Sequence, residues 1–188
     1  MNLTFNDINF YIELLKSNKK FSFTRWGDGE WSCAFGVQGA NCDSHTYFPE
    51  MGKGLNEAID NPKGYFLATW PNTEPMMFNI WRPIQTRLQN TLAKDWVDAS
   101  IWEEAAMAGE LKPFVEQLEK MNFIIISEGS KRSLPVNYTD FIEVPATNCF
   151  LEKDRIKQTM IEMCEKYDNP VFGLSASMAT NVIVDELY

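Results

Sequence analysis

Short apolar runs alternate along this chain with segments in which apolar residues recur every three or four positions. Runs of the first kind predict strands at residues 21–24, 65–69, 96–99, 123–126, 140–144 and 171–174. Segments of the second kind predict helices at residues 8–15, 29–35, 51–59, 77–88, 101–108, 111–121, 156–167 and 178–187. Pro83 lies inside one of these segments, where we expect it to kink or divide the helix because proline lacks a backbone donor.

Strands that alternate with helices are typical of α/β proteins. Three of the strands are continuous apolar runs, as in parallel sheets that helices cover on both faces. The chain contains neither the glycine pattern of dinucleotide-binding proteins nor that of P-loop kinases, which argues against both classes. We therefore expect one domain, residues 1–188, with a Rossmann-like three-layer α/β fold and a mainly parallel sheet.

The composition narrows the choice of partners and compartment. A net charge of −9 and a pI near 4.7 argue against binding nucleic acid, or an anionic membrane surface, through positive charge. No apolar run approaches the ~18 residues of a membrane span, and the first residues do not begin a signal peptide. The four cysteines show no close pairing, so we expect free thiols and a cytoplasmic protein. With a single histidine a zinc site is not expected, and His45 is interpreted as an ordinary loop residue.

The segment 25–30, with sequence RWGDGE, follows the first predicted strand. Ligands of open α/β sheets bind at the carboxyl ends of strands. Asp28 and Glu30 could hold one divalent cation only in a turn or an extended segment, since residues i and i+2 of a helix point about 200° apart. Glycines at 27 and 29 favour a turn, and Arg25 could hold a phosphate. The alternative is that Asp28 caps a helix and that Glu30 is favoured by the helix dipole.

Three other polar segments follow predicted strands. Ser127, Glu128 and Lys131 could bind phosphate, with Glu128 as a base or a ribose contact, although an ordinary polar turn explains them as well. Ser175 and Ser177 open the last predicted helix, where they either bind an anion or cap the helix. Asn148 either caps the helix that follows it or binds a ligand. In a parallel sheet these segments would share one edge with residues 25–30.

The segment 23–30 resembles the Arg-Phe-Gly-Asp-Gly-Glu signature of the GT-D-type glycosyltransferases, with Trp26 in place of the usual Phe. Weaker similarities lie at 124–129, 141–148 and 174–184, so the resemblance spans most of the chain. It implies a Rossmann-like fold, a nucleotide-sugar donor such as a UDP-sugar, and Mn²⁺ or Mg²⁺ held by Asp28 and Glu30. The remaining donor contacts that it suggests are Arg25, Gly27, Gly29, Ser127, Lys131, Asn148, Ser175 and Ser177.

The family usually continues beyond the position of Tyr188, which suggests a C-terminally short member. Three functions stay open: a metal-dependent glycosyltransferase, a non-catalytic nucleotide-sugar or glycan-binding module, and another Mg²⁺-dependent phosphate enzyme. The acceptor could be a glycan, a glycoprotein, a small molecule or a modified nucleobase. The modified nucleobase is the least expected of these, because the chain is acidic. Apolar residues of the last predicted helix would be left uncovered, so we expect a homodimer with that helix near its interface.

Overall fold

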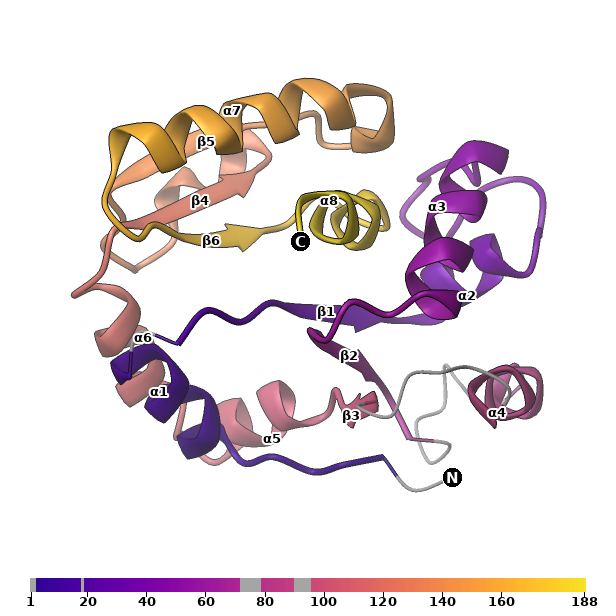
Figure 1. The fold of residues 1–188 in the computed structure, drawn as a ribbon, viewed down its shortest axis with the longest axis horizontal. Helices are drawn as coiled ribbons and strands as arrows, with labels where there is room; N and C mark the ends of the chain where they lie inside the picture. Colours follow the sequence, from indigo (N-terminus) through magenta and orange to yellow (C-terminus); the bar gives the residue numbers. More distant parts are fainter. Residues whose placement is uncertain (1–2, 18, 72–78, 90–95) are drawn as a thin grey trace.

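A computed structural model describes residues 3–17, 19–71, 79–89 and 96–188. It has the α/β architecture that the alternating pattern predicts (Figure 1). Its elements in chain order are α1 (Ile8–Lys16), β1 (Phe23–Trp26), α2 (Asp28–Ala34), α3 (Pro49–Asp60), β2 (Phe66–Thr69), α4 (Trp81–Gln89), β3 (Trp96–Asp98), α5 (Ile101–Met107), α6 (Lys112–Leu118), β4 (Phe123–Ser127), η2 (Gly129–Ser133), β5 (Asp140–Glu143), η3 (Cys149–Glu152), α7 (Lys153–Lys166), β6 (Val171–Leu174) and α8 (Ala179–Leu187).

The strands form two parallel sheets of three strands each within the described residues, with the orders β1-β2-β3 and β5-β4-β6. In the first sheet Thr24 is in register with Leu67, and Leu67 with Trp96. In the second sheet Ile124 of β4 pairs with Asp140 on one side and Phe172 on the other. The α/β class and the parallel pairing are therefore confirmed, while the single sheet that we expected is divided.

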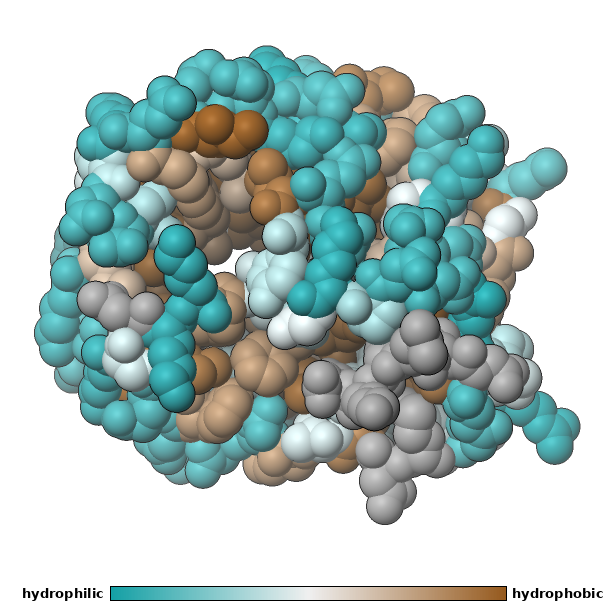
Figure 2. All heavy atoms as spheres, in the orientation of Figure 1, coloured by the Kyte–Doolittle hydropathy of each residue, from teal (hydrophilic) through white to brown (hydrophobic). Residues whose placement is uncertain are grey.

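β1 and β6 are the strands of the two sheets drawn nearest to one another in Figure 1, and they do not pair. In place of a strand ladder, α8 reaches β1: the side-chain amide of Asn181 donates a hydrogen bond to the carbonyl oxygen of Arg25, at 3.0 Å. Figure 2 shows a hollow between the second sheet and α1, rimmed partly by hydrophobic residues. The two halves of the fold are thus joined through a helix near the end of β1.

Aromatic side chains build the core above the first sheet. Trp26 and Trp31 are fully buried, and their rings lie 5.5 Å apart. A polar chain crosses this apolar region: the indole of Trp31 donates to the Thr69 hydroxyl at 3.0 Å, and that hydroxyl donates to the carbonyl of Trp26 at 3.0 Å. Buried polar groups are stable when they are paired in this way. The chain of bonds fixes α2 over the carboxyl ends of β1 and β2.

The apolar face of α8 is covered by the chain itself. Met178, Val182 and Ile183 are all at most 2% exposed. A Cβ atom on Gly54 of α3 would lie 2.8 Å from a methyl carbon of Val182, so the two helices pack closely. Of the four apolar residues expected to form an uncovered face, only Leu187 is exposed, at 37%, so the premise of the expected homodimer holds at this one position alone.

Two further expectations about the chain are settled by the structure. Pro83 does not kink a helix, because α4 begins at Trp81 and the proline lies in the first turn, where its missing donor has no intrahelical partner. Met77, placed in the same helix by its spacing, lies outside the described residues. Among the described residues no helix is long and apolar enough to cross a membrane.

Candidate active site

The segment after β1 is a helix start and not the turn that its glycines suggested. Gly27 is the N-cap of α2, and Asp28 is its first residue. The Glu30 carboxylate turns back and accepts a hydrogen bond from the Gly27 backbone N–H at 2.9 Å. This satisfies one of the donors that a helix N-terminus leaves unpaired. The alternative of a helix start therefore describes this segment, but Glu30 makes the capping bond and Asp28 does not cap the helix.

Burial and position set the ionisation of Glu30. Burial raises the pKa of its carboxyl group, opposed by the bond from Gly27 and by the positive charge of Arg25. A half-buried carboxylate that is committed to a backbone donor is a poor metal ligand. Because Asp28 and Glu30 lie two positions apart on one helix, their side chains diverge by about 200°. Joint chelation of one cation by both residues therefore does not fit this geometry.

Asp28 differs from Glu30 in having no partner. Its carboxylate makes no hydrogen bond or ion pair with any residue that the structure describes, and its side chain is half-buried. Its charge acts on Tyr47, whose pKa is raised chiefly by burial and also by this carboxylate. Mg²⁺ is commonly bound through one or two carboxylates together with substrate phosphates. Asp28 is the carboxylate of this segment that is available for such a role.

Arg25 is exposed, and its guanidinium lies over the ring of Trp70 at 4.8 Å from the centroid. Trp70 directly follows β2 and is itself buried. The stacking orients the guanidinium without using its five N–H donors. The carbonyl of Arg25 is held by Asn181, so both the backbone and the side chain of this residue are positioned. Arg25 is thus a fixed cation three positions before Asp28, and its side chain makes no ion pair within the described residues.

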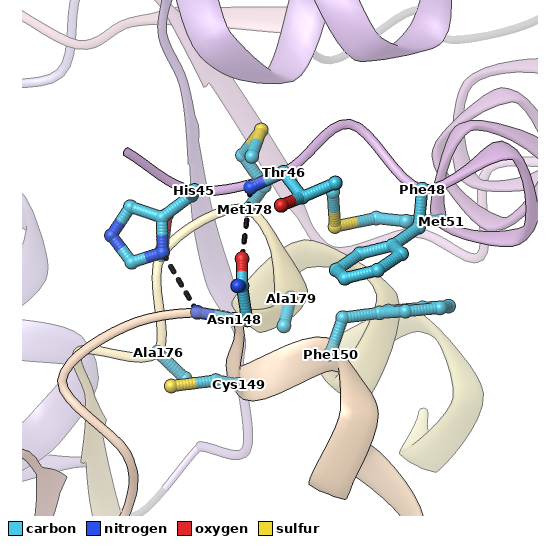
Figure 3. Close-up of a pocket in the computed structure, with 11 residues that line it drawn as sticks. His45, Thr46, Phe48, Met51, Asn148, Cys149, Phe150, Ala176, Met178 and Ala179 are labelled. Carbon is cyan, nitrogen blue, oxygen red and sulfur yellow. Dashed lines mark hydrogen bonds between the residues drawn. The ribbon is translucent and has the colours of Figure 1, made fainter. Parts of the chain in front are cut away.

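A small cavity of about 10 Å³ lies where the second sheet meets the loop before α3 (Figure 3). The side-chain oxygen of Asn148 accepts a hydrogen bond from the backbone N–H of Thr46 at 2.8 Å, and its backbone N–H donates to His45 Nδ1 at 3.2 Å. Asn148 and Ser177 both line the cavity and both have positive φ, of 57° and 52°. Left-handed backbone in non-glycine residues is costly and gathers at functional sites.

His45 thus has a structural contact that its loop position did not predict. An imidazole nitrogen that accepts a hydrogen bond carries no proton, so the neutral ring carries its proton on Nε2. Figure 3 shows the ring at the rim of the cavity, with Nδ1 turned toward Asn148. His45 therefore helps to hold the Asn148 turn in place.

Three of the predicted segments do converge. A Cβ atom on Gly29 would lie 3.5 Å from Met178 Sδ and 3.3 Å from the side-chain nitrogen of Asn41. The first turn of α2 therefore touches both the start of α8 and the loop that carries His45. Ser175, which follows β6, is exposed on the approach to α8. The segment 25–30, Asn148 and the serines at 175 and 177 belong to one region of the molecule, as the sequence predicted.

The segment after β4 behaves as an ordinary turn. Ser127 is buried, and its hydroxyl has no partner among the described residues. The Glu128 carboxylate bonds with the Ser130 hydroxyl and backbone N–H, which lower its pKa, and Lys131 lies 3.7 Å away. A carboxylate with a lowered pKa is a weak base. Glu128 caps the short helix η2, with Lys131 beside it, and the polar-turn alternative describes both residues.

Two residues that position Arg25, namely Trp70 and Asn181, were not predicted from the sequence, because each reaches Arg25 from a distant segment of the chain. In the sequence alone Trp70 is typical of a loop residue. The pairing of β2 with β1 brings the Trp70 ring under the Arg25 guanidinium. Asn181 is a polar residue on the apolar side of a predicted helix, and that anomaly was the available signal. It is 2% exposed, and buried amides are normally bonded.

Comparisons with protein-family models, with curated proteins and with solved structures returned no match. Function must therefore be argued from the site itself. Over the described residues there is no group of three or more His, Cys, Asp or Glu side chains that could hold a metal ion. A cation bound here would have Asp28 as a protein ligand and would depend on oxygens of a ligand for the rest.

Proposed function

We propose that this protein is a metal-dependent glycosyltransferase that uses a nucleotide-sugar donor, with a UDP-sugar as the first choice. The observation that carries the proposal is that Arg25 of β1 and Asp28, the first residue of α2, lie three positions apart and both lack an ion pair among the residues described. One is an exposed guanidinium and the other a carboxylate. Their sequence context, RWGDGE, resembles the signature of the GT-D-type enzymes.

The proposed roles follow from what each group can reach. The Arg25 guanidinium binds phosphate oxygens of the donor, while Trp70 keeps the guanidinium in place. Asp28 serves as ligand to Mn²⁺ or Mg²⁺, which when bound neutralises charge on the departing nucleoside diphosphate. Glu30 caps α2 and so positions Asp28. Gly27 and Gly29 contribute through the backbone of this turn.

The neighbouring loops supply the remaining donor contacts of the proposal. Ser175 and Ser177 lie between β6 and α8, and Asn148 retains the side-chain N–H₂ group that its contact with Thr46 does not use. These groups are suited to ribose or sugar hydroxyls. The acceptor is a glycan, a glycoprotein or a small molecule, and the net charge of −9 makes a modified nucleobase the least suitable. All four cysteines are free thiols, in keeping with the proposed cytoplasmic location.

A second candidate is a module that binds a nucleotide sugar without turning it over. One observation favours it: Glu30 is used as a helix cap, and Glu128 is held by Ser130, so neither is poised as a catalytic base. Another Mg²⁺-dependent phosphate enzyme is the third.

Turnover assays with a panel of UDP-sugars and GDP-sugars, with Mn²⁺ and with EDTA, distinguish the three candidate functions. Sugar transfer or metal-dependent donor hydrolysis supports the glycosyltransferase. Donor binding without turnover supports the module. Hydrolysis of unrelated phosphate esters with no response to nucleotide sugars favours the third function.

A further inference from the structure

A second, larger hollow is lined by residues of α2, α3 and α4, the helices at the end of the first sheet toward which the β1 arrow points in Figure 1. It has a volume of about 640 Å³. The residues that line it are Ala34, Phe35, Asn56, Arg82, Pro83, Thr86 and Arg87. None of them belongs to the candidate site at Arg25 and Asp28. We call this hollow the α4 groove.

One wall of the α4 groove carries a braced cation. The Nη2 atom of Arg87 donates to the side-chain oxygen of Asn56 at 3.0 Å and to a carboxylate oxygen of Asp60 at 2.7 Å. The amide nitrogen of Asn56 in turn donates to the carbonyl of Ala34 at 2.7 Å. Both bonds of the guanidinium use the same nitrogen, so the other donors of Arg87 have no acceptor in the described part of the chain. Its position is therefore fixed while most of its donors stay available.

A second cation and an aromatic ring complete the groove. Arg82 is exposed, and it has no carboxylate partner among the residues described. The Phe35 ring is 40% exposed, and it stacks on the buried Trp31 ring with centroids 5.8 Å apart and an angle of 26°. The Phe35 ring supplies an apolar surface, and Arg82 and Arg87 supply N–H donors in the same groove. In a chain of net charge −9 such a pairing is suited to an anion with an apolar part.

We propose that the α4 groove binds a small molecule that carries a phosphate on an aromatic or similarly apolar group. Arg82 and Arg87 both line the groove, and the phosphate binds to the exposed Arg82 guanidinium, since guanidinium groups match phosphate oxygens. The apolar group lies on Phe35. The groove is lined by the C-terminal end of α2, the helix that begins directly after Arg25 and Trp26, which makes it the place for a phosphorylated acceptor, a step that rests on the proposed function.

Phenyl phosphate is the probe, and backbone amide shifts in ¹⁵N-labelled protein locate its site. We expect shifts at Ala34, Phe35 and α4, together with binding at least about tenfold weaker for phenol and for Arg82→Gln, because charge-assisted hydrogen bonds are lost. Inorganic phosphate should bind more weakly than phenyl phosphate, since it lacks the ring. Arg132→Gln, which removes an exposed arginine of η2, is the matched control and should bind like the parent protein.

Three outcomes overturn the inference: equal binding of phenol and phenyl phosphate, shifts confined to Arg25 and residues 175–177, or unchanged binding by Arg82→Gln. Because Arg82 is exposed, this variant should fold normally, and thermal melting checks that it does. Binding is read without turnover. Loss of the proposed glycosyl transfer and loss of the α4 groove are therefore distinguishable results.

Discussion

The side chain of Asn181 on α8 donates to the backbone carbonyl of Arg25 on β1 at 3.0 Å, across 156 positions of sequence. Asn181 is 2% exposed, so this bond is made away from water. It takes the place of a strand partner at the edge of β1 and joins the two halves of the fold. The position of the Arg25 guanidinium therefore depends on a helix from the other end of the chain.

Replacing Asn181 with Ala should lower the free energy of unfolding by about 1–3 kcal/mol, because the Arg25 carbonyl loses its bonded donor. Urea unfolding measures the change. Asn137→Ala is the matched control: Asn137 is exposed, and no bond of its side chain is seen in the described residues, so its change should stay within about 0.5 kcal/mol. Equal effects of the two substitutions would show that the Asn181 bond does not stabilise the fold.

Glu30→Gln tests the capping role through pH. Burial raises the pKa of Glu30 above its ordinary value of 4.5, so the folded state holds this proton more tightly than the unfolded state. The resulting stability is fully present below the unfolded pKa and is lost as the pH rises through the folded one. Glutamine can accept the Gly27 bond without titrating. The variant should therefore gain stability relative to the parent as the pH rises from about 4 to 7.

Urea unfolding over this pH range gives the difference directly, with the exposed Glu50→Gln as the control. A Glu30→Gln variant that loses stability relative to the parent as the pH rises would mean that the Gly27 and Arg25 contacts outweigh burial.

At Asn148 the energetic cost of the left-handed backbone can be measured separately from the stabilisation by the hydrogen bond from Thr46. With φ at 57°, alanine at this position should cost about 1–2 kcal/mol more than glycine, since glycine alone adopts this backbone freely. Both variants lose the bond from Thr46, so glycine also should be less stable than the parent. Asn169, with φ at 47° in an exposed turn, is the control. If Asn169→Gly destabilises as much as Asn148→Gly, the Thr46 contact has no measurable role.

The close packing of α2 on α3 predicts a sensitive glycine. A Cβ atom on Gly52 would lie 2.8 Å from the carbonyl oxygen of Cys33, a backbone atom that cannot move aside easily. Gly52→Ala should therefore lower the free energy of unfolding by about 1–3 kcal/mol, although alanine is the better helix former by about 1 kcal/mol. Lys53→Ala, at the neighbouring exposed position, should be close to neutral. A stabilised Gly52→Ala variant would contradict the close approach of these two helices.

The strands and helices were predictable because burial imposes their periods locally. The apolar run at 123–126 became β4 with one added residue, and the spacing of residues 8–15 became α1. The first strand was placed two residues too early. Arg25 and Trp26 continue the ladder in register with Ala68 and Thr69, and such pairing depends on a distant segment.

The start of α2 was predicted one residue late, and its cap was assigned to Asp28, for a specific reason. The common capping signal has a Ser or Thr at the N-cap, whereas here Gly27 occupies that position and Glu30 alone makes the bond. The division of the sheet could not be foreseen either. It depends on Asn181 meeting β1, and no local pattern specifies that contact.

The proposed site depends most on Asp28 and Arg25 acting together on a nucleoside diphosphate. Isothermal titration of UDP in the presence of Mn²⁺, compared with EDTA, measures this directly for the parent protein, Asp28→Asn, Arg25→Gln and the control Glu50→Gln. We predict metal-dependent binding that the control retains, with affinity at least about tenfold lower in Asp28→Asn and in Arg25→Gln. Unchanged, metal-independent binding in Asp28→Asn would contradict the proposal and leave Asp28 as the first residue of a helix without a role in the site.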